Sequence, residues 1–196
     1  MFEIIAKGGI VMIPLLLCSV ISIAIIVERA VFWLKQRKGI MPAHLLQMTE
    51  DKNCGELMKD VSGRGSYIVR IISSGIMQKN ASATLAMETA AMQEIAMMKK
   101  YLSALDTIIT LAPLLGLLGT IVGMIQSFDI MSVVGIGQPH SVTGGVAEAL
   151  IATAFGLTVA ITTLVPYNYF LSKVEKAEEE MEQYATRVEM ILKQQE

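Results

Sequence analysis

The stretch GVAEALIATAFG, Gly145 to Gly156, decides the fold because it opens the most apolar run in the second half of the chain. The 24 residues from Ala149 to Ser172 carry no formal charge. A helix needs roughly 20 apolar residues to cross the hydrocarbon core of a bilayer, and in lipid it satisfies its backbone hydrogen bonds internally. The stretch therefore predicts a transmembrane helix with a carboxylate, Glu148, near its beginning.

Two further windows have the same character: Gly8–Val27 is uncharged for 20 residues and Thr107–Phe128 for 22. Over the 196 residues, 53% are hydrophobic and only 17% charged, whereas soluble domains carry about 25% charged residues. The sequence predicts an all-α polytopic membrane protein with three transmembrane helices, in which spans two and three extend into long cytoplasmic helices. A net charge of −2 without a basic patch argues against a nucleic-acid partner.

The distribution of lysine and arginine predicts the topology. Residues 28–103 hold 11 of them, residues 129–145 hold none and residues 172–196 hold four, and positive loops stay in the cytoplasm. The expected parts are 1–27, external N-terminus and first span; 28–103, cytoplasmic helical region; 104–128, second span; 129–145, external loop; 146–171, third span; and 172–196, cytoplasmic C-terminal helix.

Apolar residues at steps of three and four extend two of the spans beyond the membrane. One stripe runs through Met87, Ala91, Ile95, Met98, Leu102, Leu105 and Ile109, and a second through Leu171, Val174, Ala177, Met181, Tyr184, Val188 and Ile191. Because neither Gly nor Pro interrupts residues 82–111, we expect one continuous helix from about residue 82 to 128. The two stripes are expected to pack against each other as antiparallel helices.

Small residues mark the packing surfaces of the second and third spans. Gly116, Gly119 and Gly123 lie at spacings of three and four, and Gly156 lies on a similar line in the third span. Small residues at this spacing let helices approach closely in lipid. Two such surfaces in a three-span chain favour a subunit that assembles.

Three polar side chains in these spans are candidate functional residues: Thr120, Thr153 and Glu148. A threonine hydroxyl in a membrane helix can simply bond to a carbonyl of the preceding turn. Glu148 costs about 3 kcal/mol at membrane depth, which favours a functional role. If the helix begins near Gly145, however, Glu148 could cap the free N–H groups of the first turn, and both interpretations stay open.

The segments APLLGLLGTIVGMIQSF (residues 112–128), VAEALIATAFGLTVAI (146–161) and YNYF (167–170) resemble the ExbB/TolQ/MotA family of proton-channel proteins, most closely its ExbB and TolQ branch. The topology resembles that family over the whole chain. The family's usual Ala-Ile-Pro-Ala in the third span is Ala160-Ile-Thr-Thr163 here, with the proline displaced to Pro166.

The resemblance implies a homopentamer in the bacterial inner membrane, with its N-terminus periplasmic and its C-terminus cytoplasmic. Its pore would be lined by spans two and three around a single-span ExbD-like or TolR-like partner that brings a transmembrane Asp, and a TonB-like or Pal-like envelope component would be driven by it. The family's pore threonines fall on Thr120 and Thr153, and its third-span glutamate on Glu148. No cofactor is implied.

Two other functions are a structural scaffold and an enzyme. A non-conducting structural scaffold would use the same packing surfaces and long helices. An enzyme is not expected, because His44 and His140 are predicted on opposite sides of the membrane and no nucleophile–base pair is visible. Cys18 and Cys54 are likewise separated by the predicted topology, so neither a disulfide nor a metal site is expected.

Overall fold

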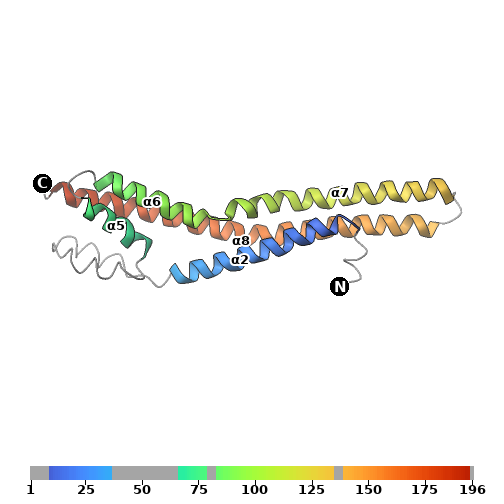
Figure 1. Cartoon of the computed structure of the whole chain (residues 1–196), viewed down its shortest axis with the longest axis horizontal. Coiled ribbons are helices and arrows are strands. Elements are labelled where there is room, and N and C mark those ends of the chain that lie inside the picture. Colours follow the sequence, from blue (N-terminus) through green and yellow to red (C-terminus); the bar gives the residue numbers. More distant parts are fainter. Residues whose placement is uncertain (1–8, 37–65, 79–82, 135–138, 195–196) are drawn as a thin grey trace. The chain divides into compact units, whose positions relative to one another are not determined.

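The computed structural model describes residues 9–36, 66–78, 83–134 and 139–194, and in these ranges the chain forms helices and no strand. The helices are α2 (Met12–Gln36), α5 (Tyr67–Met77), α6 (Ala83–Lys99), α7 (Leu102–Val134) and α8 (Pro139–Gln194) (Figure 1). Residues 37–65 and 79–82 of the predicted cytoplasmic helical region 28–103, which include His44 and Cys54, lie outside the described residues.

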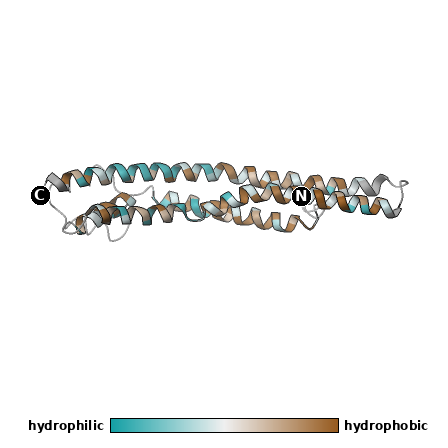
Figure 2. Cartoon of the chain, turned by 90° about the horizontal axis from the view of Figure 1, so that it is seen from above, coloured by the Kyte–Doolittle hydropathy of each residue, from teal (hydrophilic) through white to brown (hydrophobic). Residues whose placement is uncertain are grey.

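Three segments are long and apolar enough to cross a membrane: Met12–Gln36, Ala83–Ser132 and Thr143–Ile191. The predicted all-α membrane fold with three spans is therefore confirmed. Toward the C-terminus, α8 changes from apolar to largely hydrophilic (Figure 2), as the charge pattern of the tail indicated. The helix also continues through Pro166.

The prediction of one continuous helix from residue 82 to 128 is wrong. The first part, α6, ends at Lys99, and α7 begins at Leu102. Between them Tyr101 has φ 65°, in the left-handed region that an L-residue with a bulky side chain rarely adopts. The Tyr101 carbonyl then accepts the amides of Ala104 and Leu105, at 3.2 and 3.3 Å, and starts α7. Periodicity shows which face is apolar but does not detect a single left-handed residue.

The chain divides into two compact units, Met1–Glu28 with Tyr101–Tyr169 (unit 1) and Arg29–Lys100 with Phe170–Glu196 (unit 2). Unit 1 holds the N-terminal part of α2, all of α7 and the first half of α8. Its core draws on all three helices and consists of Val11, Met12, Leu15, Ile108, Ala112, Ala152 and Val159. These side chains form one hydrophobic core, to which all three uncharged windows contribute.

Unit 2 packs α5 and α6 with the second half of α8. Met87 and Met98 of the first stripe and Val174 and Met181 of the second are buried, and Lys99 Nζ lies 3.4 Å from Glu178 Oε2 of α8. The predicted packing of the two stripes is confirmed by this burial and contact.

Polar contacts also tie unit 2 together. Arg70 of α5 holds Glu94 of α6 through two hydrogen bonds of 2.5 and 2.6 Å, and this contact raises the pKa of the Arg70 guanidinium. The Tyr67 hydroxyl donates to Glu180 of α8, and burial, followed by this contact, raises the pKa of Tyr67. The last turns of α2 join the same unit through buried Arg29, which donates to the Met97 carbonyl of α6 at 2.9 Å.

Candidate functional site

The glycines of α7 and α8 lie where these two helices approach each other in unit 1. A Cβ added to Gly119 would lie 2.6 Å from the Cβ of Ala152, and one added to Gly156 would lie 2.5 Å from the carbonyl oxygen of Ala112. A Cβ added to Gly116 or Gly123 would also meet a close neighbour on α8, at 3.0 and 2.8 Å respectively. The two small-residue surfaces therefore pack on each other within one chain, and they give no separate argument for an oligomer.

The two threonine hydroxyls make different hydrogen bonds. Thr120 Oγ1 donates to the Leu117 carbonyl in its own helix at 2.6 Å, which is the back-bonding expected of a membrane threonine. Thr153 Oγ1 instead donates across the helix contact to the Gly116 carbonyl at 2.8 Å. Each hydroxyl oxygen can still accept a hydrogen bond from water or from another chain.

Both threonines lie on the side of the α7–α8 pair that is turned away from α2. On α7, a Cβ added to Gly119 would lie 3.7 Å from Val11, the residue before α2, and Thr120 follows Gly119 about 100° further around the helix. On α8, Ala152 belongs to the core shared with α2, and Thr153 is likewise about 100° further around. We call the surface that carries Thr120 and Thr153 the threonine edge.

Glu148 lies on the other side, about 140° around α8 from Thr153 at 100° per residue. It is the tenth residue of α8, which begins at Pro139, and only the first four amides of a helix lack an internal partner. The hypothesis that Glu148 caps this helix is therefore wrong. That hypothesis assumed that the helix begins near Gly145. The structure shows that α8 begins at Pro139 and continues through Gly144 and Gly145.

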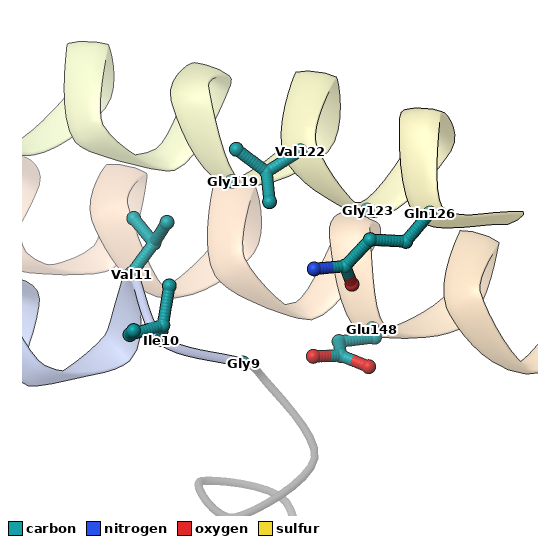
Figure 3. Close-up of a pocket in the computed structure, with 8 residues that line it drawn as sticks. All are labelled: Gly9, Ile10, Val11, Gly119, Val122, Gly123, Gln126 and Glu148. Carbon is teal, nitrogen blue, oxygen red and sulfur yellow. The ribbon is translucent and has the colours of Figure 1, made fainter. Parts of the chain in front are cut away.

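Glu148 instead faces a small pocket of about 30 Å³ between the start of α2, α7 and α8 (Figure 3). We call it the Glu148 pocket; its lining residues are Gly9, Ile10, Val11, Gly119, Val122, Gly123, Gln126 and Glu148. Gly9 has φ 70°, and a Cβ added to it would overlap Oε1 of Glu148. The glycine therefore serves both a left-handed backbone and the close approach of the carboxylate.

Gln126 and Gly9 are members of this pocket that the sequence reasoning missed. Gln126 is the only amide side chain in the uncharged window 107–128, and it follows Gly119 by seven residues, which places both on nearly the same face of α7. That spacing could have drawn attention to it. Nothing in the sequence indicated that Gly9, more than 130 positions earlier, would meet Glu148.

In the described ranges no group of three or more His, Cys, Asp or Glu side chains is placed to hold a metal ion. Cys18 is a free, half-buried thiol in α2. The site therefore consists of hydroxyls, one amide and one carboxylate, a set that can bind water and exchange protons.

Comparison with known proteins identifies the family. Residues 65–183 match the MotA/TolQ/ExbB proton channel family. A Synechocystis protein named as ExbB-like biopolymer transport protein 3 is 38% identical over 172 residues, covering 84% of this chain and 82% of that protein.

Two relatives match over shorter stretches. The biopolymer transport protein ExbB of Aquifex aeolicus is 40% identical over 39% of this chain and 52% of its own length. The Tol-Pal system protein TolQ of Pseudomonas aeruginosa is 38% identical over 46% of this chain and 39% of its own length. The chain therefore belongs to the MotA/TolQ/ExbB proton channel family, in its ExbB and TolQ branch.

Proposed function

We propose that this chain is the pore-forming subunit of a proton-driven motor in the bacterial inner membrane. Copies of it, five by resemblance to the family, surround the span of a single-span partner of the ExbD or TolR kind. Proton flow through the assembly is coupled to work on an envelope component resembling TonB or Pal. The N-terminus is periplasmic and the C-terminus cytoplasmic in this proposal.

The observation that carries the proposal is the threonine edge. Thr120 and Thr153 come from different helices, yet both lie on the side of the α7–α8 pair away from α2. A ring of subunits that turned this side inward would line a passage with two layers of hydroxyls and leave α2 on the outside. Hydroxyl oxygens can bind water in such a passage.

The chain itself carries no Asp or Glu in the uncharged windows 107–128 and 149–172. A proton relay through the middle of the membrane needs an ionisable group there, and in this proposal the partner's Asp supplies it. The energy is sufficient for mechanical work, because one charge crossing 100 mV releases about 2.3 kcal/mol.

The test is Thr120→Val in the complex with its partner, reconstituted in vesicles, with proton uptake as the readout. We expect assembly to persist and proton-coupled activity to be lost, since the change removes a hydroxyl without altering the side-chain volume greatly. The matched control is Thr158→Val: Thr158 is exposed and its hydroxyl donates to the Ala154 carbonyl of its own helix. Equal activity of Thr120→Val and the wild type would contradict the pore assignment.

A non-conducting scaffold is the second candidate, and one observation favours it. The bond from Thr153 to the Gly116 carbonyl gives this hydroxyl a structural use in the packing of α7 and α8. A scaffold predicts that the wild-type complex carries no proton current at all, and that Thr153→Val changes only stability.

A further inference from the structure

The break between α6 and α7 (Figure 1) falls in a stretch whose sequence suits one continuous helix. Residues 82–111 hold neither Gly nor Pro, and the buried side chains Met98, Leu102 and Leu105 keep helical steps of four and three across the break. The structure nevertheless places Tyr101 in the left-handed region, with φ 65°. A strained residue of this kind persists only when its surroundings hold it in place.

Arg29 of α2 provides such a hold. Its guanidinium Nη1 donates to the Met97 carbonyl at 2.9 Å and to the Met98 carbonyl at 3.3 Å. In an uninterrupted α-helix these two carbonyls would accept the amides of Tyr101 and Leu102, four residues further on. Carbonyls in the last turn of a helix lack intrahelical partners, so Arg29 donates where the continuing helix would have donated.

The surroundings of Arg29 keep its guanidinium at this position. The residue is 2% exposed, and its guanidinium carbon lies 4.6 Å from the centre of the ring of Phe32, in the next turn of α2. An arginine side chain is not deprotonated in proteins, and a buried charge has to be paired. Breaking the two carbonyl bonds without a replacement is therefore costly, which favours the broken helix.

We propose that Arg29 is a latch on a two-state joint at residues 99–102. With the latch closed, Arg29 binds the Met97 and Met98 carbonyls and the helix is broken at Tyr101, as in this structure. With the latch open, the same carbonyls accept the amides of Tyr101 and Leu102, and residues 83–134 form one helix. Both carbonyls have a donor in each state, as buried backbone groups require.

The inference goes beyond the proposed function and does not depend on it, because a conducting subunit and a scaffold can both contain this joint. The two forms differ in the helix that carries Thr120: α7 is continuous with α6 in the open form and separate from it in the closed form. A carboxylate is a stronger acceptor for a guanidinium than a carbonyl is. In a motor, an event that brings a carboxylate to Arg29 would therefore open the latch.

Amide hydrogen exchange distinguishes a latch from a simple helix cap. The amides of Leu102 and Ser103 lie in the first turn of α7, where amides lack intrahelical acceptors, and in the open form they gain carbonyl partners from the end of α6. In the full-length chain, reconstituted in membranes, Arg29→Gln should therefore slow their exchange several-fold. The matched control Lys35→Gln removes an exposed positive charge from the same helix and should leave their exchange unchanged.

Two outcomes would overturn the latch. If Arg29 merely caps α6, its loss frays the end of that helix, and Arg29→Gln speeds the exchange of Leu102 and Ser103. Unchanged exchange would mean that Arg29 does not hold the joint.

A second pair of variants tests the joint without touching the latch, in case Arg29→Gln fails to insert. Alanine favours a continuous helix, whereas glycine favours the left-handed break. Exchange of the Leu102 and Ser103 amides should therefore be slower in Tyr101→Ala than in Tyr101→Gly. Equal exchange in these two variants would exclude a two-state joint.

A distance measurement detects the open form itself. Spin labels are attached at two exposed sites, Thr89→Cys in α6 and Thr110→Cys in α7, in chains that carry Cys18→Ser and Cys54→Ser and are diluted with unlabelled chains. In one continuous helix these sites lie about 32 Å apart along the axis, at 1.5 Å per residue. A population at that spacing should grow when Arg29→Gln is added. Identical distance distributions with and without Arg29→Gln would refute the exchange between two forms.

Discussion

In the ion pair between Arg70 and Glu94, the burial of each side chain decides which of the two substitutions destabilises the protein more. The Glu94 side chain is 6% exposed, whereas that of Arg70 is 37% exposed. Removing Arg70 strands a carboxylate that cannot reach water, whereas removing Glu94 leaves a guanidinium that can turn toward solvent. The substitution Arg70→Leu should therefore cost much more than Glu94→Leu.

The magnitudes follow from the same exposures. Breaking a buried pair by removing one partner costs roughly 3–5 kcal/mol, and the partial exposure of Arg70 places Arg70→Leu at the lower end, about 3 kcal/mol. Glu94→Leu should cost about 1 kcal/mol, typical of one lost hydrogen bond. The double variant, with no charge left at the contact, should recover most of the loss of Arg70→Leu.

Amide hydrogen exchange in α5 measures this contact without requiring global unfolding. Since 1.4 kcal/mol corresponds to about a tenfold change in an equilibrium, Arg70→Leu should speed the exchange of buried Ile71 and Ile72 by roughly 100-fold. Glu94→Leu should speed it by about fivefold. Equal effects of the two single variants, or a larger effect of Glu94→Leu, would refute the reasoning that exposure decides which charge is stranded.

Two further predictions concern the backbone. Tyr101→Gly should stabilise the chain by about 1 kcal/mol, because glycine accepts the left-handed conformation without the steric cost that tyrosine carries there. The control variant Tyr101→Ala should bring no such gain. Thermal unfolding in detergent measures the stability of both variants. Gly156→Ala should destabilise unit 1 by about 1–3 kcal/mol, since the new methyl meets the Ala112 carbonyl and overpacking costs that much. Gly144→Ala is the control, because a Cβ at Gly144 meets nothing within 4 Å, and equal melting temperatures of these two variants would contradict the packing described for α7 and α8.

Much of the fold could be read from the chain directly. Three uncharged windows of 20, 22 and 24 residues leave few alternatives, because lipid forces each one to be a helix. The stripes of Met87 and Met181 were recognisable because helical period alone determines which residues share a face. The motifs around Thr120 and Glu148 pointed to the family for a related reason, since they lie in order along two consecutive spans.

The break at Tyr101 and the start of α8 at Pro139 were not predictable in this way. One left-handed tyrosine depends on local backbone energies of a few kcal/mol, and two adjacent glycines gave a false signal for a helix start at Gly145. This second error left open a capping role for Glu148, which the longer helix excludes.

Membrane class, number of spans and the apolar faces thus followed from local composition and period, because the bilayer acts on each segment independently. The placing of Thr120 and Thr153 on the side of the α7–α8 pair away from α2, and the meeting of Gly9 with Gln126 and Glu148, depended on how three helices pack. These residues are brought together by small side chains at helix contacts, where a single methyl group decides the distance between axes. Such contacts join different segments of the chain, Gly119 with Ala152 and Gly9 with Glu148, and no pattern within one segment records them.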